Sequence, residues 1–101
     1  MPTYICKFQD GDNCYYLEWS TIVDAPVTSG MSLEEFQNYY KENYGTKGLE
    51  DLPFRLHRVE ERGTSNPYES LDSLISFNRA GENESYLTKE EIIQKYCRTK
   101  T

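Results

Sequence analysis

The sequence predicts an α+β fold in which an N-terminal β-hairpin, with or without a short third strand, packs against three or four short helices. Three observations predict it: alternating apolar residues around an early turn signal, two helix-capping motifs ahead of helical-period apolar residues, and an aromatic content of 14%. Aromatic rings bury about 150–250 Å² each, so they supply a core that the few aliphatic residues alone do not. The 101 residues correspond to a single domain, residues 1–101.

The hairpin is predicted from two short runs with strand character, Tyr4–Gln9 and Cys14–Trp19, which flank the turn signal Asp10-Gly11-Asp12-Asn13. A four-residue loop places Gln9 opposite Cys14. In that register one face collects almost only apolar side chains, as a core-facing sheet surface does. These side chains are Tyr4, Cys6, Phe8, Tyr15, Leu17 and Trp19.

The opposite face of this hairpin carries a mixed set of side chains, namely Ile5, Lys7, Cys14, Tyr16 and Glu18. We expect Tyr16 to point outward from this face. The next segment, Ser20–Gly30, is either a brief third strand or an extended loop packed on the hairpin. Pro26 lacks a backbone donor, so a strand here lies at the edge of the sheet.

The first helix is predicted to begin after Ser32, which is a good N-cap and has Glu35 three residues later to complete a capping box. Gly45 is expected to end this helix in a left-handed conformation. The apolar stripe between these signals consists of Leu33, Phe36, Tyr40 and Tyr44, and Met31 pairs with Phe36 at its start.

The segment of residues 49–63 has two interpretations. A helix that stops at Gly63 is predicted by apolar residues at helical spacing, which are Leu49, Leu52, Leu56 and Val59. A strand from Phe54 is the alternative, because apolar and polar residues alternate there. The alternation breaks at Arg58, which favours the helix.

Two further helices are predicted toward the C-terminus. The first follows the cap-and-proline signal Asn66-Pro67 and stops at Gly81. The second follows a capping box of Thr88 and Glu91 and runs over residues 89–98. Its apolar residues are Ile92, Ile93 and Tyr96, with Leu87 ahead of the cap.

Composition excludes several classes of function. A net charge of −6 and a pI near 4.7 argue against non-specific nucleic-acid binding, which relies on a basic surface. No apolar stretch approaches the roughly 18 residues of a membrane span, and the N-terminus lacks the pattern of a signal peptide. Three cysteines are an odd number, which favours reduced thiols and a cytoplasmic protein.

The sequence contains no recognisable catalytic, metal or cofactor motif. The cysteines lack CxxC spacing, the phosphate-binding glycine patterns are absent, and no nucleophile motif accompanies the single histidine, His57. His57 has Glu61 one helical turn later, which is typical of an exposed surface pair. We therefore predict no catalytic residue, no metal and no cofactor. The alternative is an enzyme, or an enzyme subunit, whose site forms around His57 at an oligomer interface.

Exposed tyrosines beside acidic residues are the strongest functional signal. Tyrosine is enriched at interface hot spots, and neighbouring carboxylates suit a basic partner. The candidate partner-binding residues are Tyr16, Glu18, Asp24, Glu35, Tyr39, Glu42, Tyr68 and Glu69.

These residues predict a small acidic cytoplasmic binding protein. It would act as a regulator or inhibitor by docking on a basic surface of a protein partner. Accessory proteins of phages and mobile elements, including nucleic-acid mimics, act in this way. A further alternative is a structural subunit of a homo-oligomer joined through Ser20–Gly30.

Overall fold

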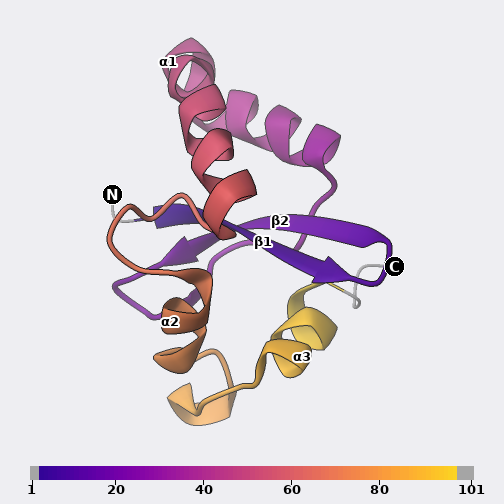
Figure 1. Ribbon diagram of the computed structural model, residues 1–101, viewed down its shortest axis with the longest axis vertical. Coiled ribbons are helices and arrows are strands. Elements are labelled where there is room, and N and C mark those ends of the chain that lie inside the picture. The colour runs from indigo at the N-terminus through magenta and orange to yellow at the C-terminus, as the bar shows by residue number, and fades with distance from the viewer. Residues whose placement is uncertain (1–2, 98–101) are drawn as a thin grey trace.

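The computed structural model describes residues 3–97 and has the predicted α+β class. Its antiparallel sheet contains the strands β1 (Thr3–Asp10), β2 (Asn13–Ser20) and β3 (Ala25–Pro26), in that order (Figure 1). The helical segments are α1 (Leu33–Arg62), α2 (Leu71–Ser76), the 3-10 turn η1 (Glu82–Glu84), α3 (Lys89–Ile92) and the π-helical turn η2 (Ile93–Cys97). None of the helices in this part of the chain is long and apolar enough to cross a membrane.

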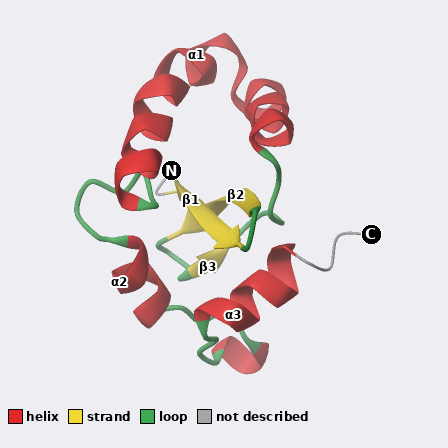
Figure 2. Ribbon diagram, turned by 45° about the vertical axis from the view of Figure 1, so that its right-hand side comes forward, coloured by secondary structure: helices red, strands yellow, loops and turns green. Residues whose placement is uncertain are grey.

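The sheet lies between two helical layers. Figure 2 shows α1 as an arch over one face of the sheet, with α2 and α3 on the other side. Each layer buries its own apolar cluster against the sheet. The two clusters therefore lie on opposite faces of the same hairpin.

The predicted hairpin register is confirmed. Gln9 lies opposite Cys14, and the ladder continues by one further pair, Asp10 and Asn13. The turn itself therefore holds only Gly11 and Asp12, so the expected four-residue loop is wrong, although the register is correct. Gly11 has φ +61°, and glycine tolerates this conformation at the first position of a two-residue hairpin turn.

The predicted core face is also confirmed. Phe8 and Trp19 are fully buried on it, with ring centroids 6.5 Å apart. The apolar residues of α2, α3 and η2 cover this face, namely Leu71, Leu74, Ile75, Ile92, Ile93 and Cys97.

The opposite face is buried as well, so the expectation that Tyr16 points outward is wrong. Ile5, Tyr16 and Glu18 retain only 1%, 5% and 3% of their exposure. The reason is that α1 needs an apolar surface for its own stripe, and this face supplies it. The helix side of this cluster consists of Phe36, Tyr40, Leu52 and Val59.

Helix α1 combines the two helices predicted over residues 32–63. The Ser32–Glu35 capping box is present, and Gly63 ends the helix with φ 82° and ψ −10°. Gly45 interrupts it with φ 68° and ψ −160°, a conformation that is essentially restricted to glycine. The chain turns there into a first arm (residues 33–44) and a second arm (residues 46–62), so the helical interpretation of residues 49–63 is correct.

Short segments outside the hairpin cover both edges of the sheet. The short strand β3 pairs with β2 through Ala25 and Pro26, which confirms a third strand at the edge. On the other side, the backbone of residues 63–65 bonds to β1. Lys7 N donates to Gly63 O at 2.9 Å, and Ser65 N donates to Ile5 O at 2.9 Å.

Helix α2 is shorter than predicted at both ends. It begins after Ser70, whose side chain caps Ser73 N. Asn66 instead caps a turn, because its Oδ1 accepts from Tyr68 N at 2.7 Å and from Glu69 N at 3.1 Å. The helix ends at Ser76, and the buried Asn78 side chain then bonds to the backbone of Leu87, which holds the chain in a loop.

The last helix begins as predicted. Thr88 and Glu91 form the capping box ahead of α3, and the coil continues as η2 to Cys97. The predicted end at Arg98 lies outside the described residues.

Candidate functional site

Glu18 and Tyr39, two of the predicted partner-binding residues, bind each other inside the molecule. The Tyr39 hydroxyl donates to Glu18 Oε1, and the Tyr44 hydroxyl lies 3.0 and 2.9 Å from the two carboxylate oxygens. Burial and the hydrogen bond to Glu18 raise the pKa of Tyr39 and of Tyr44. These bonds replace the water that a buried carboxylate loses, so the cluster joins the first arm of α1 to β2.

Tyr16 takes part in a second cluster of this kind. Its hydroxyl donates to Glu60 Oε1 at 2.8 Å, and Lys7 Nζ lies 2.9 Å from Glu60 Oε2. The hydrogen bonds from Lys7 and Tyr16 lower the pKa of the Glu60 carboxyl. Tyr16 therefore ties β2 to the second arm of α1 rather than facing a partner.

The remaining predicted residues lie nearer the surface, in separate places. Glu35 belongs to the capping box of α1, and Glu42 is exposed on the first arm. Tyr68 is 87% exposed, and the neighbouring Glu69 accepts from Ser73 Oγ at 3.2 Å. Asp24 lies in the turn between β2 and β3.

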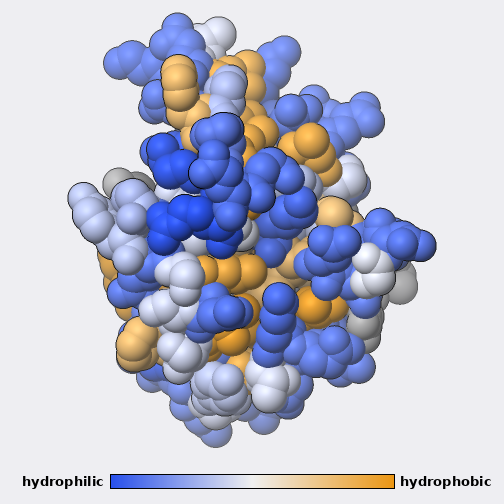
Figure 3. Space-filling model, viewed as in Figure 1, coloured by the Kyte–Doolittle hydropathy of each residue, from blue (hydrophilic) through white to orange (hydrophobic). Residues whose placement is uncertain are grey.

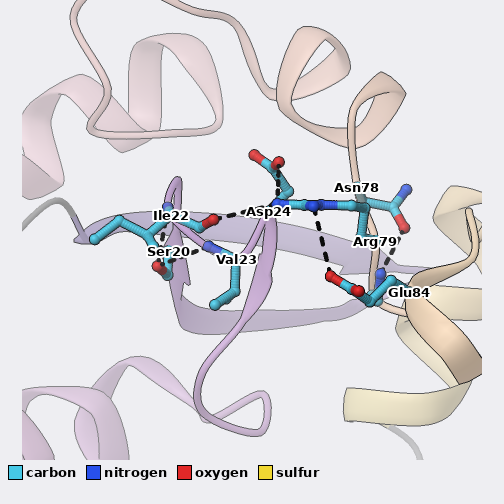
Figure 4. A network of polar contacts seen from close by, with 8 residues as sticks. Ser20, Ile22, Val23, Asp24, Asn78, Arg79 and Glu84 are labelled. Carbon is cyan, nitrogen blue, oxygen red and sulfur yellow. Dashed lines mark hydrogen bonds and ion pairs between the residues drawn. The ribbon is translucent and has the colours of Figure 1, made fainter.

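That turn displays two apolar side chains on a fixed backbone. Ser20 Oγ accepts from Ile22 N at 3.2 Å and from Val23 N at 3.4 Å (Figure 4). Asp24 adopts a left-handed conformation with φ 53°. Ile22 and Val23 are 67% and 48% exposed, respectively. The turn therefore holds these two side chains in solvent.

Arg79, from the loop after α2, holds the turn from the other side. Its Nη2 lies 3.3 Å from Ile22 O and 3.2 Å from Asp24 Oδ2, and its backbone N donates to Asp24 O at 2.8 Å. Its Nη1 lies 3.5 Å from Glu84 Oε1 (Figure 4). One guanidinium thus connects the β2–β3 turn with the loop that contains η1.

The chain around α2 and α3 combines exposed aromatic rings with negative charge. Tyr68, Phe77 and Tyr86 are 87%, 61% and 56% exposed. Between Tyr68 and Ile92 the basic residues are Arg79, which binds the β2–β3 turn, and Lys89. The acidic residues of the same segment are Glu69, Asp72, Glu82, Glu84, Glu90 and Glu91. We call these aromatic and acidic residues, together with Ile22 and Val23, the acidic aromatic surface.

Most of this surface was not predicted from the sequence. Tyr68 and Glu69 are among the predicted residues, whereas Phe77 and Tyr86 are not, and neither is Arg79, which holds the β2–β3 turn. The signal available in the sequence was the Ile22-Val23 pair, which stands in a short segment between a strand and a proline. The contact between Arg79 and Ile22 joins residues 57 positions apart, so local patterns do not indicate it.

His57 lies outside the two pockets that accompany α1. Its Nε2 is 2.6 Å from Glu61 Oε1, and the two side chains are 75% and 63% exposed, as expected for a surface pair. Neither pocket described below is lined by His57. Among residues 3–97 no group of three or more His, Cys, Asp or Glu side chains is placed to hold a metal ion.

Two pockets accompany the arch of α1. One, of about 420 Å³, lies between the arms, where Figure 3 shows hydrophobic residues at the surface. Its lining residues are Gln37, Asn38, Lys41, Leu49, Leu52, Pro53 and Leu56. The other, of about 360 Å³, lies where the start of β1 meets both arms.

Comparisons with protein-family models, curated proteins and solved structures give no match for this chain.

Proposed function

We propose that this protein is a small acidic binding protein that docks on a basic surface of a protein partner and thereby regulates or inhibits it. The observation that carries the proposal is the acidic aromatic surface, because Tyr68, Phe77 and Tyr86 are exposed along a segment that contains six carboxylates. Aromatic side chains supply large contact areas at interfaces, and carboxylates select for arginine and lysine.

The backbone of the β2–β3 turn supports the same proposal. Ser20 and Arg79 hold the turn from both sides, so the backbone at Ile22 and Val23 loses little conformational freedom when a partner binds. Ordering a loop at an interface costs binding free energy, and a loop that is already ordered avoids that cost. An apolar socket rimmed by basic side chains is the partner surface that fits this arrangement.

The balance of charge supports a basic partner. Arg79 already binds Asp24 and Glu84, so its positive charge is largely compensated within the molecule. The other carboxylates of the surface retain an excess of negative charge. Attraction between exposed charges weakens as salt is added, because the screening length shortens to about 8 Å at physiological ionic strength.

A pull-down with the full chain as bait tests the proposal. Proteins retained by the wild-type chain should be lost with the triple variant Tyr68→Ala/Phe77→Ala/Tyr86→Ala, and their retention should fall steeply as salt is raised. Phe54→Ala is the matched control, because Phe54 is 71% exposed but lies on the second arm of α1. Retention that ignores salt, or that depends on Phe54 and not on the three aromatic residues, contradicts the proposal.

A further inference from the structure

The pocket at the start of β1 gathers polar groups from three elements. It has a volume of about 360 Å³ and is lined by the strand start, the first arm and the second arm of α1. The lining residues are Thr3, Tyr40, Tyr44, Lys47, Gly48, Asp51 and Arg55. Pockets of this size that contain a few converging polar groups are the usual form of small-molecule sites.

Two cations of this pocket have no partner within the described chain. Other basic side chains are engaged internally: Arg58 donates to Ser65 O at 2.8 Å, and Arg62 donates to Asn66 O at 2.6 Å. Within residues 3–97, neither Lys47 nor the half-buried Arg55 forms a hydrogen bond or an ion pair. A half-buried guanidinium without a hydrogen-bond acceptor is unfavourable, because its donors have lost part of their water.

Tyr40 adds a hydroxyl donor to the same place. The residue is 5% exposed, and its hydroxyl has no hydrogen-bond partner among residues 3–97. Burial raises the pKa of Tyr40 and outweighs the opposing effect of the nearby Arg55, so the hydroxyl keeps its proton. Thr3 also lines the pocket, but its side chain hydrogen-bonds to Tyr44.

Gly48 allows the pocket to form at this point. A Cβ atom on Gly48 would overlap Cβ of Tyr44 and would lie 3.2 Å from the Tyr40 ring. A side chain here would therefore push the second arm away from the first arm. Glycine brings Lys47, Asp51 and Arg55 of the second arm close to the tyrosines of the first.

We propose that this pocket binds the phosphate group of a small hydroxyl-bearing phosphate monoester. Arg55 and Lys47 supply charge-assisted donors, and the Tyr40 hydroxyl supplies a neutral one. Three terminal phosphate oxygens use more of these donors than the two oxygens of a carboxylate. Asp51 has no role toward the anion and instead accepts a hydrogen bond from a hydroxyl of the ligand.

Two-dimensional ¹H–¹⁵N NMR of the full chain tests this proposal at matched ionic strength. Titration with inorganic phosphate should give saturable shifts at the amides of Thr3, Tyr44, Lys47, Gly48 and Arg55. Glycerol 3-phosphate should bind at least several-fold more tightly than inorganic phosphate, because its hydroxyls reach Asp51. Sodium acetate and sodium chloride should not give saturable shifts, and equal binding of acetate and phosphate overturns the choice of ligand.

Substitutions separate a built site from general attraction of anions. Arg55→Gln and Lys47→Gln should each weaken phosphate binding about tenfold, while Lys41→Gln, which changes an exposed lysine of the other pocket, should not. Asp51→Asn should remove the preference for glycerol 3-phosphate without weakening the binding of inorganic phosphate. Thermal melts show which variants fold, and Lys47→Gln replaces Arg55→Gln if the latter does not. Unchanged binding by both folded variants, or equal shifts around Lys41 and Lys89, overturns the site.

Discussion

The Tyr39 hydroxyl donates a hydrogen bond to the buried carboxylate of Glu18, which links the first arm of α1 to the central strand of the sheet. Tyr44, five residues further along the arm, reaches the same carboxylate. Tyr39 and Glu18, which the sequence predicts to bind a partner, thus stabilise the fold instead. The proposed partner-binding residues therefore lie elsewhere on the molecule.

Tyr39→Phe should destabilise the protein by about 1.5–3 kcal/mol. The substitution removes a hydrogen bond to a charged, buried group and leaves that group less well solvated. Urea unfolding followed by circular dichroism measures the change in the free energy of unfolding. Tyr68→Phe is the control, because Tyr68 is 87% exposed, and its effect should stay within about 0.5 kcal/mol. Equal effects of the two substitutions would show that the bond to Glu18 contributes nothing.

The Glu60 carboxyl should make stability depend on pH. Its pKa is lowered in the folded protein by Lys7 and Tyr16, so it contributes stability above the ordinary carboxyl pKa. This contribution disappears as the pH falls through the lowered pKa. Glu60→Gln should therefore be less stable than the wild type near pH 7, and the difference should shrink toward pH 3.

Urea unfolding at several pH values measures this dependence. Glu50→Gln is the control, since Glu50 is exposed on the same arm and has no bond partner among residues 3–97. A pH-independent difference for Glu60→Gln would mean that the loss comes from packing rather than from the ionised carboxylate.

The three cysteines should differ in reactivity in the folded protein. Burial raises the pKa of the Cys6 thiol to about 12, and Cys97 is also buried, whereas Cys14 is partly exposed. Because the thiolate is the reactive form, an alkylating reagent should modify Cys14 first. Mass spectrometry of the labelled protein identifies the sites. Early modification of Cys6 would mean that the strand pair opens on the timescale of labelling.

The two cores should contribute to stability independently, because the sheet separates them. Phe36→Ala on the α1 side should cost about 3–5 kcal/mol, and Ile92→Ala on the other side about 2–5 kcal/mol. Residues without shared partners usually have additive effects. The double variant, measured by urea unfolding if it still folds, should therefore lose the sum of the two values. If it does not fold, the milder pair Phe36→Leu and Ile92→Val provides the same comparison.

Local signals in the sequence predict the helix starts and the hairpin. They fail where contacts between distant residues determine the structure. The Ser32–Glu35 and Thr88–Glu91 boxes depend on residues three apart, and both are present. The hairpin register follows from alternation, and it is correct. The Asn66-Pro67 signal is also local and predicts the start of a helix. Asn66 caps a turn instead, because the chain first passes along the edge of β1.

The candidate site was predicted less well for the same reason. Whether Tyr16 faces water depends on where α1 docks, and nothing within the hairpin determines that. The face of the hairpin that carries Ile5 and Tyr16 is partly apolar. This was the signal in the sequence that a helix covers this face as well. Tyr68 is exposed as expected, but it lies in a turn that Asn66 caps and not in the first turn of a helix.

The apex of the α1 arch offers a place for chemical attachment. At Gly45 a Cβ atom would meet nothing within 4 Å, and the residues on both sides are exposed. A short flexible insertion at this point would lengthen the connection between the two arms of α1 and leave both arms packed on the sheet. A reporter group or an affinity handle introduced there would be separated from α2 and α3, which lie on the other side of the sheet (Figure 2).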